Sequence, residues 1–201
     1  MKNHEVIAAA SQSVENSGGW CSPVKAAILA SIVLELRPAV VVEIGVWTGS
    51  SLIPMLLALK HTGTGVAHAI DAWSPRVSVR NEATANRTWW GSVDHDEALR
   101  RFRSRLDAYE VARYCEIHRA ESNACNVPPS IDLLHVDGSH TDQAIQDVER
   151  FGAAIRPSGV MVMDDLGWEG GGVDRAVARA RELGFADLYQ IDKWLVMEKR
   201  A

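Results

Sequence analysis

The stretch Val40–Ser51 (VVVEIGVWTGSS) constrains the fold more than any other part of the chain. A run of β-branched residues leads into Glu43 and Ile44, and such a continuous apolar run is typical of a strand buried on both faces of a parallel sheet. Gly45 and Gly49 follow, and serines then open an apolar helix. A glycine-rich turn between such a strand and a helix lets a ligand approach the backbone closely. The stretch therefore predicts a βα unit with a ligand site at its turn.

Strands and helices alternate along the rest of the chain. The expected strands are residues 40–44, 66–71, 113–119, 131–137, 160–164, 185–190 and 194–198, and the expected helices are 4–15, 23–36, 50–60, 94–108, 141–155 and 173–183. A tight turn joins the last two strands, so we expect them to pair antiparallel. This order predicts an α/β fold, a Rossmann-like three-layer sandwich with a seven-stranded, mostly parallel sheet and an antiparallel C-terminal strand. Its ligands should bind beyond the carboxyl ends of the strands, beside the first one.

Length and composition narrow the class of protein. A chain of 201 residues indicates one domain over residues 1–201, with N-terminal helices in 1–37 and a Trp- and Arg-rich loop, expected as a substrate lid, in 72–93. A formal net charge of −5 gives no basic footprint for nucleic acid, and the apolar runs are too short to cross a membrane. Few cysteines and no signal-like N-terminus favour a cytoplasmic protein. Compact enzymes of this size often form homo-oligomers.

Acidic residues end the first two expected strands. Glu43 adds a negative charge at the first, and Asp71 ends the second, where a carboxylate can accept hydrogen bonds from both hydroxyls of a ribose. The glycines lack the G-x-G-x-x-G spacing of a pyrophosphate site. A nucleoside that carries positive charge and no phosphate suits such a turn, and S-adenosylmethionine (SAM), a sulfonium, is one. The expected SAM site comprises Glu43, Gly45, Gly49, Ser50, Asp71, Ser122 and Asp137. For Ser122, a helix cap is an equal alternative.

A second group of acids ends two later strands. Asp137 follows the run LLHV, and Asp164 and Asp165 follow VMVM. If these strands are neighbours, the carboxylates share one cleft, where an oxygen-preferring cation such as Mg²⁺ or Mn²⁺ can relieve their repulsion. The alternative is that one aspartate caps a helix or binds the ligand's amino group. His140 follows within the sequence DGSH, where a histidine can serve as a general base; the alternative is a surface or N-cap histidine.

Other residues near this edge have less specific readings. His135 shares a strand face with Asp137, and we expect a buried core histidine. Tryptophans stand in the expected lid and in loops that can reach the cleft. They are Trp73, Trp89 and Trp90 in the lid and Trp20 and Trp168 outside it, and ordinary packing is the alternative for the lid residues.

Together, EIGVWTGSS, IDAW, SIDLLHVDGSH and RPSGVMVMDD resemble the class I SAM-dependent methyltransferases, over roughly residues 18–199. The most similar group is a small bacterial one that includes macrocin-type sugar O-methyltransferases and cephalosporin-hydroxylase-like proteins. The resemblance implies that Asp137, Asp164 and Asp165 bind Mg²⁺ and that His140 is the base. It implies SAM binding by the glycine turn and by the acid after the second strand. The expected reaction is metal-dependent O-methylation of a small hydroxylated acceptor, such as a sugar or a natural-product intermediate. Ser158 departs from the usual RPGG.

Other classes of protein remain open. An NAD(P)-dependent oxidoreductase is one, because Tyr189 and Lys193 have the Tyr-x-x-x-Lys spacing, although they fall on an expected strand and turn rather than on a helix. An iron-dependent hydroxylase built on His135, Asp137 and His140 is another. A non-catalytic SAM-binding protein is the third.

Overall fold

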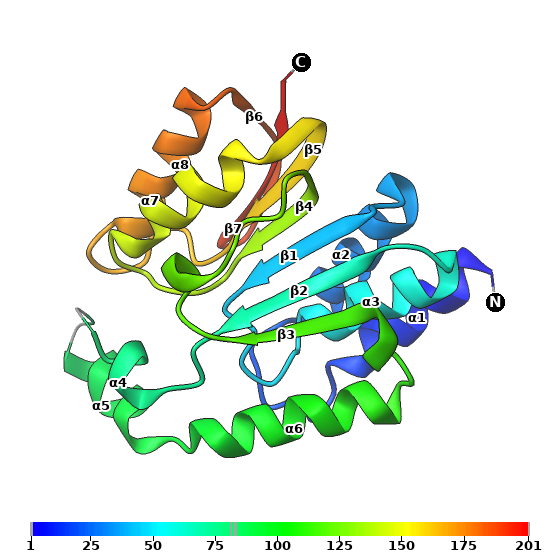
Figure 1. Ribbon diagram of the computed structural model, residues 1–201, viewed down its shortest axis with the longest axis horizontal. Coiled ribbons are helices and arrows are strands. Elements are labelled where there is room, and N and C mark those ends of the chain that lie inside the picture. The colour runs from blue at the N-terminus through cyan, green and yellow to red at the C-terminus, as the bar shows by residue number, and fades with distance from the viewer. Residues whose placement is uncertain (1, 81, 83, 201) are drawn as a thin grey trace.

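The computed structural model describes residues 2–80, 82 and 84–200. At its centre lies a seven-stranded sheet in the order β3-β2-β1-β4-β5-β7-β6 (Figure 1). The strands are β1 (Val40–Ile44), β2 (Val66–Asp71), β3 (Cys115–Arg119), β4 (Ile131–Val136), β5 (Ile155–Met163), β6 (Phe185–Ile191) and β7 (Trp194–Lys199). β1 to β5 pair in parallel, and β7 is antiparallel to both β5 and β6. The expected Rossmann-like sheet is confirmed.

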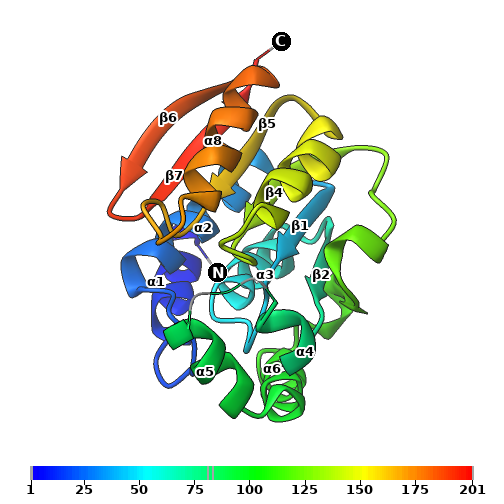
Figure 2. The same ribbon diagram turned by 90° about the vertical axis from the view of Figure 1, so that its left-hand side faces the viewer.

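Helices cover both faces of the sheet (Figures 1 and 2). They are α1 (Asn3–Ser13), α2 (Pro23–Leu36), α3 (Leu52–Thr62), α4 (Pro75–Ser78), α5 (Thr84–Ser92), α6 (His95–Ala108), α7 (Gln143–Asp147) and α8 (Gly172–Glu182). Successive β1 residues point to opposite faces, so Val41 packs with α1, α2, α3 and α6, whereas Val42 packs with α7 and α8. Within the described residues, no helix has the length and apolar character needed to span a membrane.

The strand order reverses beside β1. This strand pairs with β2 on one side and with β4 on the other, and the chain crosses over in opposite directions from it. The crevice at the carboxyl ends of β1 and β4 is therefore the topological switch point, where open α/β sheets bind their ligands. Asp71, Asp137 and Asp164 all stand at or just beyond carboxyl ends on this edge.

Three expected elements differ from the structure. The segment 72–93, expected as a long loop, contains α4 and α5; Pro75 stands in the first turn of α4, where its fixed φ favours a helix. Residues 81 and 83 of this expected lid lie outside the described residues. The helix expected over 141–155 is the short α7 followed by a π-helical turn, η3 (Val148–Gly152). β5 begins at Ile155, before the expected start at residue 160, and its pairing with β4 contains a register shift along this added part.

Candidate functional site

The turn after β1 depends on its two glycines. Gly45 has φ +89°, and a Cβ atom there would lie 2.0 Å from the carbonyl oxygen of Asp137. Gly49 has φ +75°, and its Cβ would lie 2.4 Å from the ring of Phe102. Both positions combine a left-handed backbone with close packing, so only glycine fits. Ser50 is buried after this turn, against Gly19 of the N-terminal segment.

Asp71 holds this turn in place. Its Oδ2 accepts hydrogen bonds from the backbone N–H groups of Val46 (3.0 Å) and Trp47 (2.8 Å), and its Oδ1 accepts one from Trp73 N–H (2.7 Å). Burial raises the pKa of Asp71 above its ordinary value, although these bonds favour the carboxylate. Three of the four acceptor sites of the carboxylate are thus occupied by backbone, and ribose binding by Asp71 stays a prediction.

Glu43 lies in an apolar environment at the end of β1. Its side chain is fully buried and accepts a hydrogen bond from Ser51 Oγ, and Glu43 Oε1 lies 3.2 Å from Nδ1 of His135. Burial raises the pKa of Glu43 to about 8 and lowers that of His135 to about 3. Burial thus disfavours the charged form of both side chains, and the negative charge expected at the end of β1 stays a prediction. His135 is confirmed as a buried core residue.

Lys25 is the residue that sequence reasoning missed. It lies in the first turn of α2, where its backbone N–H donates to the Ser22 cap, and its side chain is 6% exposed. Its ammonium group pairs with Asp164 and lies 3.8 Å from Asp137 Oδ2. A lysine at the start of the apolar segment PVKAAILA is a weak sequence signal, and nothing local relates it to strands more than a hundred residues away. Lys25 supplies the positive charge between the ends of β4 and β5.

His140 and Asp165 form a second pair at this edge. His140 Nε2 lies 2.8 Å from Asp165 Oδ2, and its Nδ1 is buried without a hydrogen-bond partner, 3.9 Å from Glu82 Oε2. Burial by itself lowers the pKa of His140, but the interactions with Asp165 and Glu82 raise it to about 9. The ring of Trp168 stacks on the imidazole with centroids 4.1 Å apart. No sequence pattern distinguishes Glu82 from the other polar residues of the expected lid.

The three aspartates expected to bind Mg²⁺ or Mn²⁺ do not converge on one point. Within the part of the chain that the structure describes, no group of meeting ligand atoms contains all three: Asp137 meets Glu43 and His135, and Asp164 and Asp165 belong to no such group. Each aspartate also has a cationic or imidazole partner, which is Lys25 for Asp137 and Asp164 and His140 for Asp165. As arranged, these residues do not fit a divalent cation, because Lys25 already neutralises two of them. Metal dependence stays a prediction.

The remaining candidates lie apart from this edge or fail to converge. Ser122 Oγ is 2.5 Å from Asp147 Oδ1 in a buried network, so its hydroxyl is engaged with α7. Tyr189 lies on β6 and Lys193 in the turn after it, without the helix that a Tyr–Lys dyad requires. The iron set does not assemble either: the group that meets at His135 contains Glu43 and Asp137 but not His140.

One of the tryptophans lies in the hydrophobic core, and four others form a cluster beside the turn after β1. Trp73, expected in the lid, is fully buried against Phe102, because its indole N–H can donate to the Trp47 carbonyl while the ring packs under α6. Trp20, Trp47, Trp89 and Trp90 form an aromatic cluster with neighbouring centroids 4.7–6.1 Å apart. Through this cluster, α5 packs over the turn after β1.

Comparisons with known proteins agree with this fold. A family model described as a methyltransferase domain matches residues 42–166. The O-methyltransferase TomG from Streptomyces achromogenes, involved in tomaymycin synthesis and solved with SAM, has a TM-score of 0.66 at 16% identity, over 98% of this chain and 90% of TomG. The O-methyltransferase NovP has a TM-score of 0.72 at 15% identity, over 90% of this chain and 81% of NovP. An O-methyltransferase from Bacillus cereus, solved with SAH, has a TM-score of 0.64 at 15% identity, over 96% of this chain and 90% of that protein. No curated protein sequence matches the chain.

The sheet order and the site at its switch point define a class I methyltransferase fold, which these solved structures share. The family model extends over most of the chain, from β1 to the acids after β5. The chain belongs to the methyltransferase-domain family. The resemblance to class I SAM-dependent methyltransferases is thereby confirmed at the level of family and fold.

Proposed function

We propose that this protein transfers the methyl group of SAM to a hydroxyl oxygen of a small molecule. Family membership supports methyl transfer, and the glycine turn at the switch point supports a nucleoside cofactor there. TomG and the Bacillus cereus protein, which share this fold, are O-methyltransferases solved with SAM and SAH. Nothing comparable favours a nicotinamide cofactor or an iron centre.

The arrangement of His140 is the observation that supports a hydroxyl oxygen as the methyl acceptor. In the neutral form of His140, Asp165 accepts from Nε2–H and the lone pair is on Nδ1, which is buried without a hydrogen-bond partner. In the proposed reaction, Nδ1 takes the hydroxyl proton as the acceptor oxygen attacks the SAM methyl group. The C–O bond forms, the C–S bond breaks with its electron pair on sulfur, and S-adenosylhomocysteine leaves.

Electrostatics and positioning supply the rest of the catalysis. Lys25 is held by Asp164 at the ends of β4 and β5, where a cation can stabilise negative charge developing on the acceptor oxygen. No step here is routed through Mg²⁺ or Mn²⁺. If a metal binds Asp137, Asp164 and Asp165, as the sequence predicts, chelation with EDTA should abolish turnover and Mg²⁺ should restore it.

The acceptor is proposed as a sugar or a natural-product intermediate with a hydroxyl group. Trp168 stacks on His140, and Trp20 of the aromatic cluster is 68% exposed. Flat aromatic surfaces of this kind can pack against the apolar face of a ring-shaped acceptor. We also propose a cytoplasmic location and homo-oligomerisation.

Replacement of the proposed base tests this function. We expect His140→Ala to lower kcat by about 10²–10⁴-fold and to leave the Kd for SAM nearly unchanged, because His140 acts on the acceptor. Turnover is measured with methyl-labelled SAM over a panel of sugars and phenols, and SAM binding by calorimetry. His4→Ala, an exposed histidine on α1, is the control. Equal turnover by His140→Ala, or label on nitrogen or carbon, would contradict the proposal.

A further inference from the structure

The outer strands of the sheet carry a cluster that takes no part in the proposed methyl transfer. In the β2–β3 ladder, His68 pairs with Glu116 and Ile70 pairs with His118. Residues that pair in a parallel ladder, and residues two apart on one strand, point to the same face of the sheet. His68, Glu116 and His118 therefore share one face, which is the face opposite to that of Asp71.

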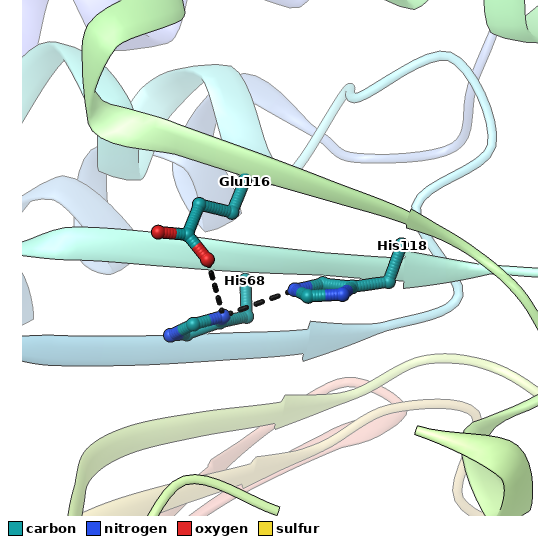
Figure 3. A group of neighbouring side chains, drawn as sticks. All are labelled: His68, Glu116 and His118. Atoms are coloured by element: carbon teal, nitrogen blue, oxygen red, sulfur yellow. Dashed lines mark hydrogen bonds and ion pairs between the residues drawn. The ribbon is translucent and has the colours of Figure 1, made fainter. Parts of the chain in front are cut away.

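The three side chains converge on a single point (Figure 3). Nδ1 of His68 lies 3.0 Å from Nε2 of His118 and 3.5 Å from Oε2 of Glu116. All three ligand atoms lie within 4.8 Å of one another. The two imidazoles come from neighbouring strands, with their centroids 5.3 Å apart and 26° between their planes.

The two separations from His68 Nδ1 are close to those around a bound transition metal. Zinc binds histidine nitrogen and carboxylate oxygen at about 2.0–2.2 Å, which places neighbouring ligand atoms about 3.3–3.5 Å apart in a tetrahedron. Two imidazoles and one carboxylate form a donor set that zinc uses with water as its fourth ligand. Burial lowers the pKa of His68 below its ordinary value, which favours the neutral ring that a metal requires.

The cluster is also accessible. The Glu116 side chain is 59% exposed, whereas that of His68 is 18% exposed. An ion can thus enter past Glu116 and reach the imidazole nitrogens of His68 and His118, whose backbones are fixed in β2 and β3. Backbone pairing fixes the two strands, so little conformational freedom is lost when the ion binds.

We propose that His68, Glu116 and His118 form a zinc-binding site that joins β3, the edge strand, to β2. The ion would hold three side chains from two strands and leave one position for water. The site shares no residue with the candidate methyl-transfer site, so its function is structural: it stabilises the edge of the sheet.

The experiment is a titration of the metal-free full-length protein with ZnCl₂, followed by calorimetry and by thermal unfolding. We expect one bound equivalent and a Tm that rises with zinc concentration, because the ion binds the folded chain. His68→Ala and His118→Ala should each lose this equivalent and the rise in Tm, and Glu116→Gln should weaken binding. His4→Ala and His61→Ala remove histidines elsewhere and should retain both.

Co²⁺ provides a readout that is independent of stability. Bound at this site, it should show the visible absorption bands of a four-coordinate ion, and His68→Ala should lose them. Zinc binding that survives in the double variant His68→Ala/His118→Ala would overturn the proposal, as would the absence of any saturable equivalent in the unsubstituted protein. Neither result would depend on methyltransferase activity.

Discussion

At the scale of single residues, Gly45 shows how one missing side chain makes the site. Its Cβ would meet the backbone carbonyl of Asp137, which no rotamer change can relieve, and its φ is +89°. We expect Gly45→Ala to destabilise the fold by about 2–4 kcal/mol and to abolish SAM binding. Gly63→Ala is the matched control: φ there is +74°, but nothing lies within 4 Å. It should cost only the strain of a left-handed residue, about 1–2 kcal/mol. Urea unfolding measures both, and equal losses would contradict the role of close packing.

His140 makes stability depend on pH with a definite sign. Its pKa is raised in the folded state to about 9, from 6.5. A raised pKa means that the contribution is fully present below about pH 6.5 and is lost as the pH rises through about 9. We expect His140→Gln to be less stable than the unsubstituted protein by on the order of 3 kcal/mol at pH 6, and about as stable near pH 10. Urea unfolding at the two values checks this, with His4→Gln as the control.

The same shift bears on catalysis. His140 can take a proton only in its neutral form, and with a pKa of about 9 it is mostly protonated at pH 7. Turnover should therefore increase between pH 7 and pH 9 and then level off. A rate that is flat over this interval would show that bound substrate displaces Glu82 or Asp165, or that another group is the base.

At the scale of elements, α2 reaches across the sheet edge through its first turn. The Ser22 cap and Pro23 start the helix where Lys25 can enter between β4 and β5. We expect Lys25→Met to destabilise the fold by about 3 kcal/mol, because two partly buried carboxylates lose their cation. Mg²⁺ should restore part of this loss, since the vacated site then resembles the predicted metal centre.

The control and the opposing outcome for Lys25 are both available in this chain. Lys60→Met removes a lysine whose partner, Glu110, is 82% exposed, so it should change stability little. Thermal unfolding with and without Mg²⁺ compares the variants. If Lys25→Met is no less stable than Lys60→Met, then Lys25 does not neutralise this edge. If Mg²⁺ stabilises the unsubstituted protein as much as Lys25→Met, then lysine and metal do not compete.

At the scale of the whole molecule, local sequence patterns are sufficient to predict the sheet but not the long-range pairing of side chains at its edge. The strands were predictable because buried parallel strands are continuous apolar runs, and the strand ends then placed Asp137, Asp164 and Asp165 on one edge. The pairing of Lys25 with Asp164 was not predictable, because these residues are 139 positions apart in sequence. The raised pKa of Glu43 was not predictable either, since it depends on burial by layers that assemble only in the folded chain.

The proposed cofactor site is a property of the assembled sheet, because its residues come from β1, β2 and β4 and the turns after them. A ligand that binds the folded chain alone raises stability by mass action, by about 2.7 kcal/mol at a hundred times its Kd. We expect SAM and S-adenosylhomocysteine to raise Tm with increasing concentration, and NAD to leave it unchanged. Asp71→Asn should weaken the shift, because the amide NH₂ would have to face a backbone N–H donor, either those of Val46 and Trp47 or that of Trp73. A rise with NAD and none with SAM would assign the switch point to the other cofactor.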